Sequence, residues 1–393
     1  MPSIGIPLNP NSFALLNIVP SPPIEIKRSQ LVFISLLEVE YFANFISDSA
    51  IISSMNIIKK SPIGKIQDYY NSYLNLGDGY IVDLVLAARI SLRFKNPLWL
   101  CIQGPPSSGK TEILKLLKKR DPKCHYLYDI TGKTLFSGAN GAEGGYIPRE
   151  VKNEGIIIFP DFTTVLSAPL YTQSIIMSQL RIIHDGDASR LTGIDTNRKR
   201  PWSGKVGVLI GVTDAIEGFK KKAASLGERF LYYRHFVPEF NAIDYRKPPI
   251  PEQFPEDELN ELFELMNSIN PSERSDEMER KINCAASWIA RGRAVVKRDS
   301  RTKEIDQVFP PEEPYRLIEQ LSTLLNSLII IHMNQVSDRV QKIFIDVVTG
   351  CVPRDRMEIV NCLWQKGNTG LKREELTHLL NSFNNSSLTH LLQ

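Results

Sequence analysis

The chain has 393 residues, of which 42% are hydrophobic and 23% charged, and it carries a net charge of +3. This composition excludes a disordered or collagen-like chain, and the length allows two or three domains. The small positive charge does not identify a partner. Short basic clusters at residues 118–120, 198–200 and 220–222 would suit phosphate backbones, but such clusters are more often solvated faces.

Cysteine usage and apolar runs suggest where the protein works. The five cysteines are scattered without a CxxC pair, which predicts reduced thiols in a cytoplasmic protein and no zinc site. The N-terminal residues lack a basic start followed by a long apolar run, so we expect no signal peptide. The most apolar run, SLIIIHM, is too short to span a bilayer, and we expect no membrane partner.

Residues 1–84 are expected to form an N-terminal, mostly helical region. The helical spacing in GYIVDLVLAARISLRF predicts a helix that leads into PLWLCIQG, a continuous apolar run typical of a strand buried on both faces. Strand and helix patterns then alternate as far as Val237. Such alternation indicates an α/β fold with a parallel sheet flanked by helices, which we assign to residues 85–245.

A Pro-rich connector, YRKPPIPEQFPED, ends this core. The amphipathic patterns EDELNELFELMNSI, EMERKINCAASWIARGR and EPYRLIEQLSTLLNSLIIIHM predict a helical lid over residues 246–350. A last helical unit is expected over residues 351–393, where RDRMEIVNCLWQK and KREELTHLLNSF resemble the start of a winged helix. Its recognition helix would begin at Ser386 or Ser387 and read DNA, and the alternative is a plain helical tail.

The segment GPPSSGKT has the spacing GxxxxGK[ST] and lies between the buried strand and the helix EILKLLKKR. Backbone N–H groups of such a loop hold phosphates, which predicts ATP and Mg²⁺ as cofactors; the alternative is a simple Gly/Pro turn. Lys110 would reach the β- and γ-phosphates, and the Thr111 hydroxyl would bind Mg²⁺. The expected nucleotide-contacting residues of the loop are Gly104, Pro105, Ser107, Ser108, Gly109, Lys110 and Thr111.

A second apolar strand pattern, IIIFPDF, delivers Asp161, which we predict to bind Mg²⁺ directly or through water. The alternative is a solvent-facing aspartate at the end of a buried strand. In an ordinary ATP hydrolase a second acid follows and activates the attacking water. Here the following residue is Phe162.

Five further sequence segments follow in chain order: TLFSG, QLRIIHDGDASRLTG, VGVLIGVTDA, LGERFLYYRHFVP and EEPYRLIEQL. Together with the phosphate loop they resemble the AAA+ ATPases, in the branch of bacterial enhancer-binding activators and minichromosome maintenance helicases. The resemblance covers roughly residues 85–330. It implies a P-loop AAA+ core with a helical lid, of a kind that also serves replication in phages and mobile elements.

The resemblance implies roles for three arginines. Arg229 matches the arginine finger, which reaches the γ-phosphate bound by a neighbouring subunit, and Arg234 is a second candidate. Arg316 matches the sensor-2 arginine of the lid. The alternatives are an ion pair of Arg229 with an acid such as Glu228, and a surface position for Arg316. Shared sites of this kind imply a homo-oligomeric ring, most often a hexamer.

Alignment of LIGVTD with the sensor-1 strand places Asp214, next to Thr213, where the family has asparagine. An aspartate can accept a proton as well as orient water. We therefore hypothesise that Asp214 partly replaces the missing acid at Phe162. The alternative is that Asp214 caps the following segment AIEGFKKKA.

The substrate is less defined than the nucleotide. The Gly-rich stretch at residues 137–150 lacks the activators' GAFTGA motif and offers only Tyr146 and Arg149 for stacking and phosphate pairing, so it suits either a threading loop or a plain surface loop. We expect an ATPase that acts on DNA as a helicase or helicase loader in replication. The alternatives are a protein remodeller or transcription regulator, and a switch that binds ATP without hydrolysis.

Overall fold

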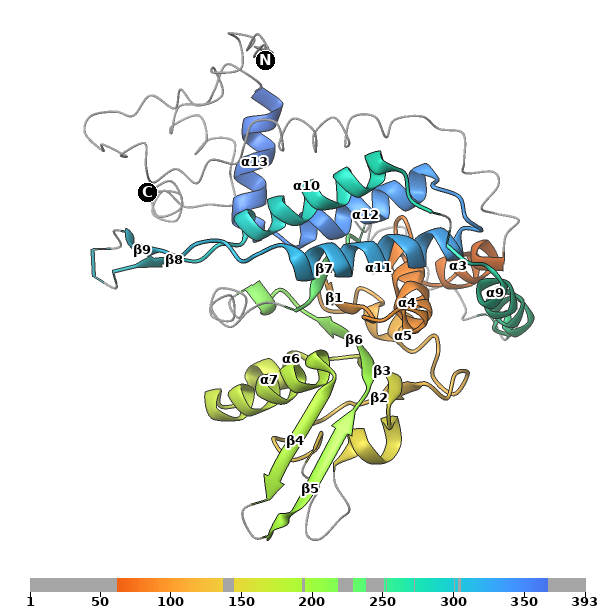
Figure 1. The fold of residues 1–393 in the computed structure, drawn as a ribbon. Helices are drawn as coiled ribbons and strands as arrows, with labels where there is room; N and C mark the ends of the chain where they lie inside the picture. Colours follow the sequence, from red (N-terminus) through yellow and green to blue (C-terminus); the bar gives the residue numbers. More distant parts are fainter. Residues whose placement is uncertain are drawn as a thin grey trace, which may run out of the picture.

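The computed structural model describes residues 62–136, 145–192, 195–217, 229–237, 251, 253–271, 273–299, 301–302 and 305–366. A sheet of five parallel strands flanked by helices lies at its centre (Figure 1). The predicted α/β class is therefore confirmed. The strands stand in the order β2-β3-β6-β1-β7, with bounds β1 (Trp99–Gln103), β2 (Cys124–Tyr126), β3 (Glu154–Phe159), β6 (Lys205–Val212) and β7 (Leu231–Arg234).

The central strands are buried along almost their whole length, as their apolar sequences require. β1 pairs with β6 on one side and with β7 on the other; Leu100 lies opposite both Leu209 and Leu231. Because all three strands are parallel, their carboxyl ends meet at one edge of the sheet. The residues that follow β1, β6 and β7 are thus brought together from distant parts of the sequence.

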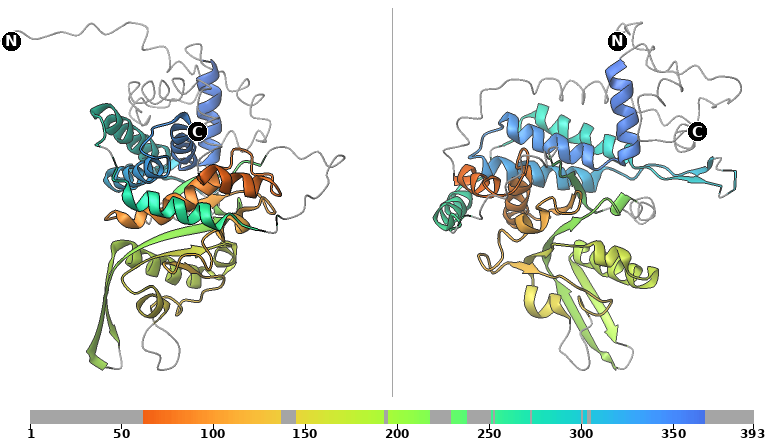
Figure 2. Two further views of the ribbon diagram at one scale, coloured as in Figure 1. Left: turned by 90° about the vertical axis from the view of Figure 1, so that its right-hand side faces the viewer. Right: turned by 180° about the vertical axis from the view of Figure 1, so that it is seen from behind.

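Helices cover both faces of this sheet. The crossover from β1 to β2 contains α5 (Lys110–Leu114), and the one from β3 to β6 contains α6 (Thr163–Ser167) and α7 (Leu170–Asp185). These crossovers run in opposite directions across the sheet, so right-handed connections place α5 and α7 on opposite faces. Figures 1 and 2 show α7 on one side and α4 (Tyr80–Ile90) with α5 on the other.

Two antiparallel hairpins leave the body of the molecule. β4 (Asp187–Thr192) pairs with β5 (Asp195–Ser203), and the hairpin extends well beyond the sheet (Figure 2). Its register brings Arg190 opposite Arg200. β8 (Val296–Arg298) and β9 (Ile305–Val308) form the second. The sequence analysis expected alternating strands and helices as far as Val237 and only helices in the lid, and it missed both hairpins.

A helical layer covers one end of the sheet (Figure 1). Of the helices expected after the Pro-rich connector, those at residues 256–269, 277–293 and 313–333 are present, as is the first helix of the last unit, whereas KREELTHLLNSF lies outside the described residues. Two helices of the layer begin at serine caps: Ser275 accepts from the Met278 N–H and Ser337 from the Val340 N–H. The layer consists of α9 (Glu256–Ser268), α10 (Asp276–Gly292), α11 (Tyr315–Ile331) and α12 (Asp338–Gly350), and α13 (Arg354–Lys366) projects from it (Figure 1).

α12 covers the edge strand β7 at very short range. A Cβ atom on Gly350 would lie 2.2 Å from the Tyr232 carbonyl oxygen, so only glycine allows this approach. The Tyr232 N–H donates to Cys351 Sγ at 3.3 Å. The edge of the sheet is therefore closed by the helix that the sequence analysis assigned to the lid.

A buried carboxylate ties this layer to the helices that precede β1. Asp83 of α4 is completely buried and accepts hydrogen bonds from Gln67 of α3 (Pro62–Asn71), His332 and Arg339 at 2.6–3.2 Å. Burial alone would raise the pKa of Asp83, but the Arg339 cation and the hydrogen bonds from His332 and Arg339 outweigh it and lower the pKa to about 2. Since α4 belongs to this network, the expected domain boundary at residue 85 falls inside a helix.

Several expectations lie outside the described residues: the region 1–61, most of the Gly-rich stretch at 137–144, and residues 367–393 with Ser386 and Ser387. Of the unit expected at 351–393 only its first helix, α13, is described. Within the described ranges, no helix is both long enough and apolar enough to cross a membrane.

Candidate functional site

The loop between β1 and α5 has the backbone of a tight anion-binding turn. Ser107 has φ 60° and Gly109 has φ 78°, both in the left-handed region that favours glycine. Gly109 forms the N-cap of α5 without a side-chain capping bond. Leu74 and Leu76 pack 3.4 Å from the position that a Cβ on Gly109 would take. This glycine is therefore needed for its backbone conformation, whereas a Cβ would meet the two leucines at ordinary van der Waals distance.

The inner side of the loop presents a row of backbone donors. Within the part of the chain that the structure describes, no group accepts a hydrogen bond from the backbone N–H groups of Ser107, Ser108, Gly109, Lys110 and Thr111. Successive free N–H groups at a helix N-terminus attract negatively charged oxygens. The predicted phosphate loop thus has free backbone donors, and phosphate binding stays a prediction.

Lys110 adds a positive charge inside this loop. Its ammonium group is buried and donates to the carbonyl oxygens of Gly104 at 2.8 Å and Pro105 at 2.6 Å, and to Ser108 Oγ at 3.0 Å. Burial lowers the pKa of Lys110, and the nearby carboxylates of Asp214 and Asp161 oppose that shift. The ammonium therefore lies between the donors of the loop and two acids.

These two acids follow neighbouring strands at the same edge of the sheet. Asp161 follows β3, is exposed, and accepts the Thr163 N–H at 2.9 Å. Asp214 follows β6 and Thr213; its side chain is 58% exposed and accepts from Gln103 Nε2 at 3.0 Å. The structure thus brings together the loop, Asp161 and Asp214, as the sequence analysis expected.

Gln103 was not anticipated. It is the last residue of β1, and it is almost fully buried. Its amide holds the Asp214 carboxylate beside the loop. A polar residue at the carboxyl end of an otherwise apolar strand, directly before the loop, was the signal in the sequence that could have identified it.

The donor set at this edge fits a magnesium ion held mainly by phosphates and water. No group of three or more Asp, Glu, His or Cys side chains that could hold a metal occurs among the described residues. Mg²⁺ usually takes one or two carboxylates together with substrate phosphates and water. The exposed Thr111 hydroxyl and the Asp161 carboxylate meet that requirement.

Phe162, which takes the place of the usual second acid, belongs to the core. Its side chain is 1% exposed and packs edge-on against Phe159, with ring centroids 5.3 Å apart. Its backbone N–H donates to the Gly211 carbonyl at 2.8 Å. The residue therefore fixes the start of α6 and offers no group to a water molecule.

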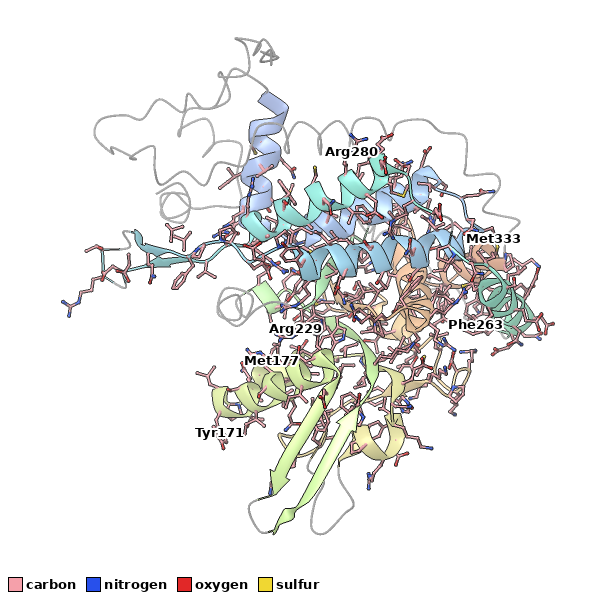
Figure 3. The ribbon with its side chains drawn as sticks, viewed as in Figure 1. Tyr171, Met177, Arg229, Phe263, Arg280 and Met333 are labelled. Atoms are coloured by element: carbon pink, nitrogen blue, oxygen red, sulfur yellow. The ribbon has the colours of Figure 1, made fainter. Side chains whose placement is uncertain are left out.

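Arg229 and Arg316 lie together near the opposite end of β1. Trp99, the first residue of β1, packs against His184 and Phe230, with ring centroids 5.2 Å and 5.1 Å apart. Arg229 is 13% exposed and lies 3.4 Å from Asp185 (Figure 3). Burial lowers the pKa of Arg229, and the Arg316 cation adds to that shift. The partner suggested for Arg229, Glu228, lies outside the described residues.

His184 is held between these cations. Burial and then the charges of Arg229 and Arg316 lower the pKa of His184 to about 4, although Asp185 opposes the shift. The imidazole is therefore neutral at pH 7. The cluster retains a net positive character in a half-buried position.

Arg234 is engaged inside its own chain. Its guanidinium donates to the carbonyl oxygens of Thr349 at 3.1 Å and Val352 at 2.6 Å, and to Glu217 at 3.4 Å. These bonds fasten the end of α12 to β7. The residue thus has a structural role within the subunit, and its assignment as a second finger stays a prediction.

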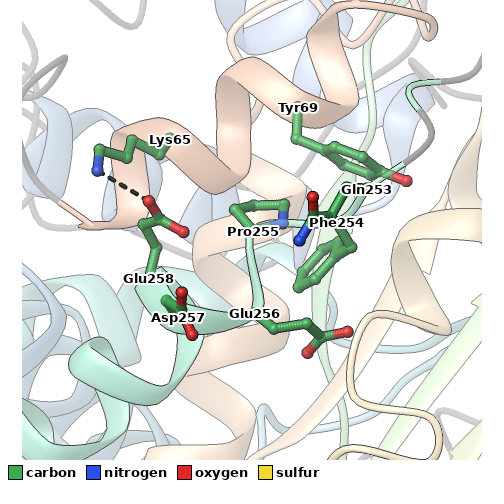
Figure 4. Close-up of a pocket in the computed structure, with 8 residues that line it drawn as sticks. All are labelled: Lys65, Tyr69, Gln253, Phe254, Pro255, Glu256, Asp257 and Glu258. Atoms are coloured by element: carbon green, nitrogen blue, oxygen red, sulfur yellow. Dashed lines mark hydrogen bonds and ion pairs between the residues drawn. The ribbon is translucent and has the colours of Figure 1, made fainter.

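Two other features lie apart from the loop. Tyr146 packs edge-on against His125, with ring centroids 5.9 Å apart, whereas Arg149 is exposed. A hollow of about 430 Å³ lies beside α3 and α9 (Figure 4). It contains the exposed Lys65–Glu258 ion pair and no residue of the phosphate loop.

Comparison with known proteins identified no relative: no protein-family model matches the chain, and no curated protein matches it significantly.

Proposed function

We propose that the protein is an ATP-binding motor of the AAA+ type that hydrolyses ATP to act on DNA in replication. The observation that carries the proposal is the loop with five unaccepted backbone N–H groups and the Lys110 ammonium, placed beside Asp161 and Asp214 at one sheet edge. Donors for phosphates, a cation and two carboxylates are the groups that phosphoryl transfer needs.

Each residue would have a distinct task. The loop N–H groups and Lys110 would bind the phosphates, and Thr111 and Asp161 would hold Mg²⁺, which when bound neutralises phosphate charge. Asp214 would accept a proton from the attacking water, because Phe162 has no acid to offer. Gln103 would orient Asp214 through its 3.0 Å hydrogen bond.

Arg229 and Arg316 would contact the nucleotide bound by a second copy of the chain. β1 has five residues, about 17 Å at the usual rise, and it separates the loop from the cluster at Trp99. Arg229 and Arg316 are therefore better placed to reach a neighbour's nucleotide than their own. This arrangement supports the proposal of a homo-oligomeric ring, with six subunits expected from the resemblance.

DNA is proposed as the substrate because of the β4–β5 hairpin. It extends from the body, and its register brings Arg190 opposite Arg200 and Leu191 opposite Lys199. Basic residues on a projecting ribbon suit a phosphate backbone.

The proposal is tested by measuring ATP turnover with and without single- and double-stranded DNA, beside Lys110→Ala. Turnover that DNA stimulates and that the variant loses would support a DNA motor. Turnover indifferent to DNA would favour the protein remodeller or transcription regulator. Tight ATP binding without turnover would identify a switch, and the absence of any nucleotide binding would refute the proposal.

A further inference from the structure

His235 follows β7 and lies directly against the phosphate loop. Its side chain is buried, with 4% exposure. Its backbone N–H donates to the Gln103 carbonyl at 2.7 Å, which continues the β7–β1 pairing by one residue. A Cβ on Gly104 would lie 3.2 Å from the His235 carbonyl oxygen and 3.3 Å from its Cβ. The histidine and the start of the loop are therefore closely packed.

The imidazole makes one specific hydrogen bond. His235 Nε2 lies 3.0 Å from the Ser108 carbonyl oxygen. A carbonyl only accepts, so Nε2 carries the proton in this contact. Burial and the nearby Lys110 cation lower the pKa of His235, which keeps the ring neutral, although the bond to Ser108 acts in the opposite direction.

The other ring nitrogen has no partner. Nδ1 is buried, and no group in the described part of the chain forms a hydrogen bond with it. An aliphatic side chain of similar volume would fill the space without burying an unsatisfied acceptor. Packing alone therefore does not account for a histidine here, whereas the bond from Nε2 to the loop does.

That bond controls the direction of one loop N–H. The Ser108 carbonyl and the Gly109 N–H belong to the same planar peptide and point in opposite directions. While His235 holds the carbonyl, the Gly109 N–H points away from His235. Gly109 has φ 78° and could rotate this peptide more easily than another residue.

We infer that His235 is a positioning residue for phosphate binding, which fixes the Ser108–Gly109 peptide so that its N–H faces a di- or triphosphate. The inference rests on the proposed nucleotide binding and extends it to a residue outside the GxxxxGK[ST] pattern. Because the contact concerns the loop alone, it acts on the phosphate moiety and is indifferent to the base.

The test compares three substitutions by calorimetric titration with ADP, ATP and tripolyphosphate. Gln places an amide N–H near the position of Nε2, whereas Asn is too short to reach Ser108 and Leu has no donor. We expect His235→Leu and His235→Asn to raise the Kd of all three ligands about tenfold, which corresponds to roughly one hydrogen bond. His235→Gln should stay close to the wild type. In assays of ATP turnover, the Leu and Asn variants should show a raised KM and a nearly unchanged kcat.

Controls separate this inference from the proposed function. Thermal unfolding without ligand shows whether each variant is folded, and Asn and Gln form a matched polar pair should Leu disrupt the core. Wild-type affinity in the folded Asn variant, or equal losses in Asn and Gln, would overturn the positioning role while leaving nucleotide binding intact. A wild-type protein that binds none of the three ligands would overturn both.

Discussion

The two ends of β1 differ in how their polar groups are held. At the carboxyl end, backbone N–H groups are unaccepted, and Asp161 and Asp214 are exposed. At the amino end, Arg229 is 13% exposed and shares its surroundings with a second arginine. One end is an open set of donors and acids, and the other is a half-buried set of cations.

The two ends offer different groups to a nucleotide. The loop has the Lys110 cation but, among the described residues, no arginine is bonded to it. In the described part of the chain, Arg229 of the arginine cluster lies 3.4 Å from the Asp185 carboxylate. In the proposed ring, the two half-sites at opposite ends of the strand would form a complete site where two copies associate head to tail. The predictions below test that reading, from the largest expected effect to the smallest.

The first prediction uses one variant at each end of β1 and a mixture of the two variant proteins. Arg229→Ala should lower kcat on the order of a thousandfold, because an arginine that stabilises the transferred phosphoryl group contributes at least that much. Lys110→Ala should abolish turnover through the other end. A mixture of the two inactive variants should recover part of the wild-type rate, since some interfaces combine an intact loop with an intact arginine. A mixture as inactive as its components would contradict a site shared between subunits.

The second prediction concerns the buried Asp83 network, which holds the end of the helix that carries Arg316. α11 bears this residue and ends near His332, which Asp83 binds at 2.8 Å. Asp83→Asn leaves the Arg339 charge buried without its counter-ion, so the free energy of unfolding should fall by about 3–5 kcal/mol in urea titrations. The matched control is Glu258→Gln, which breaks the exposed Lys65–Glu258 pair and should change nothing measurable.

The pH dependence of the Asp83 network has a definite sign. The folded pKa, about 2, lies below that of the unfolded chain. The contribution to stability is therefore complete above the unfolded value near pH 4 and is lost as pH falls toward 2. In Asp83→Asn the free energy of unfolding should fall less between pH 4 and pH 2 than in the wild type. An unchanged fall would mean that other carboxylates cause it.

The third prediction tests the carboxyl end alone. Asp214→Asn keeps an oxygen that can accept from Gln103 but cannot take a proton from water. We expect kcat to fall about a hundredfold with ATP affinity unchanged. Gln103→Leu should give a smaller fall by releasing Asp214. If Asp214→Asn turns over ATP at the wild-type rate, the residue does not replace the acid missing at Phe162.

The fold was largely readable because its central strands are continuous apolar runs. PLWLCIQG contains β1 and IIIFPDF contains the carboxyl end of β3, and α9, α10, α11 and α13 occur where their apolar periodicity placed them, whereas α12 was not anticipated. The β4–β5 hairpin was missed because its strands, DASRLT and DTNRKRPWS, are polar and lack an alternating apolar pattern. Periodicity reports burial, and it therefore fails for strands whose residues are mostly polar.

The site was readable only where a spacing carries the chemistry. The loop residues follow a fixed pattern, whereas the hydrogen bonds of Gln103 and His235 join residues that are more than 100 positions apart in the chain. The pairing of β1 with β6 and β7 creates those contacts, and no local pattern encodes them. The proximity of Arg229 and Arg316 has the same origin, because α11 reaches the start of β1 through Gln320, which accepts the Trp99 N–H.

The smallest predicted effect is a pH response at the amino end. His184 has a folded pKa of about 4 because burial and the two arginines oppose its protonation. The unfolded chain takes up this proton near pH 6.5, so stability should fall as pH drops from 6.5 toward 4 and then level off. His184→Gln should remove about 2 kcal/mol of that loss in urea titrations at pH 7 and pH 5. An equal loss in wild type and variant would show that His184 is not confined between the two cations, and the half-buried character of this end would have to be abandoned.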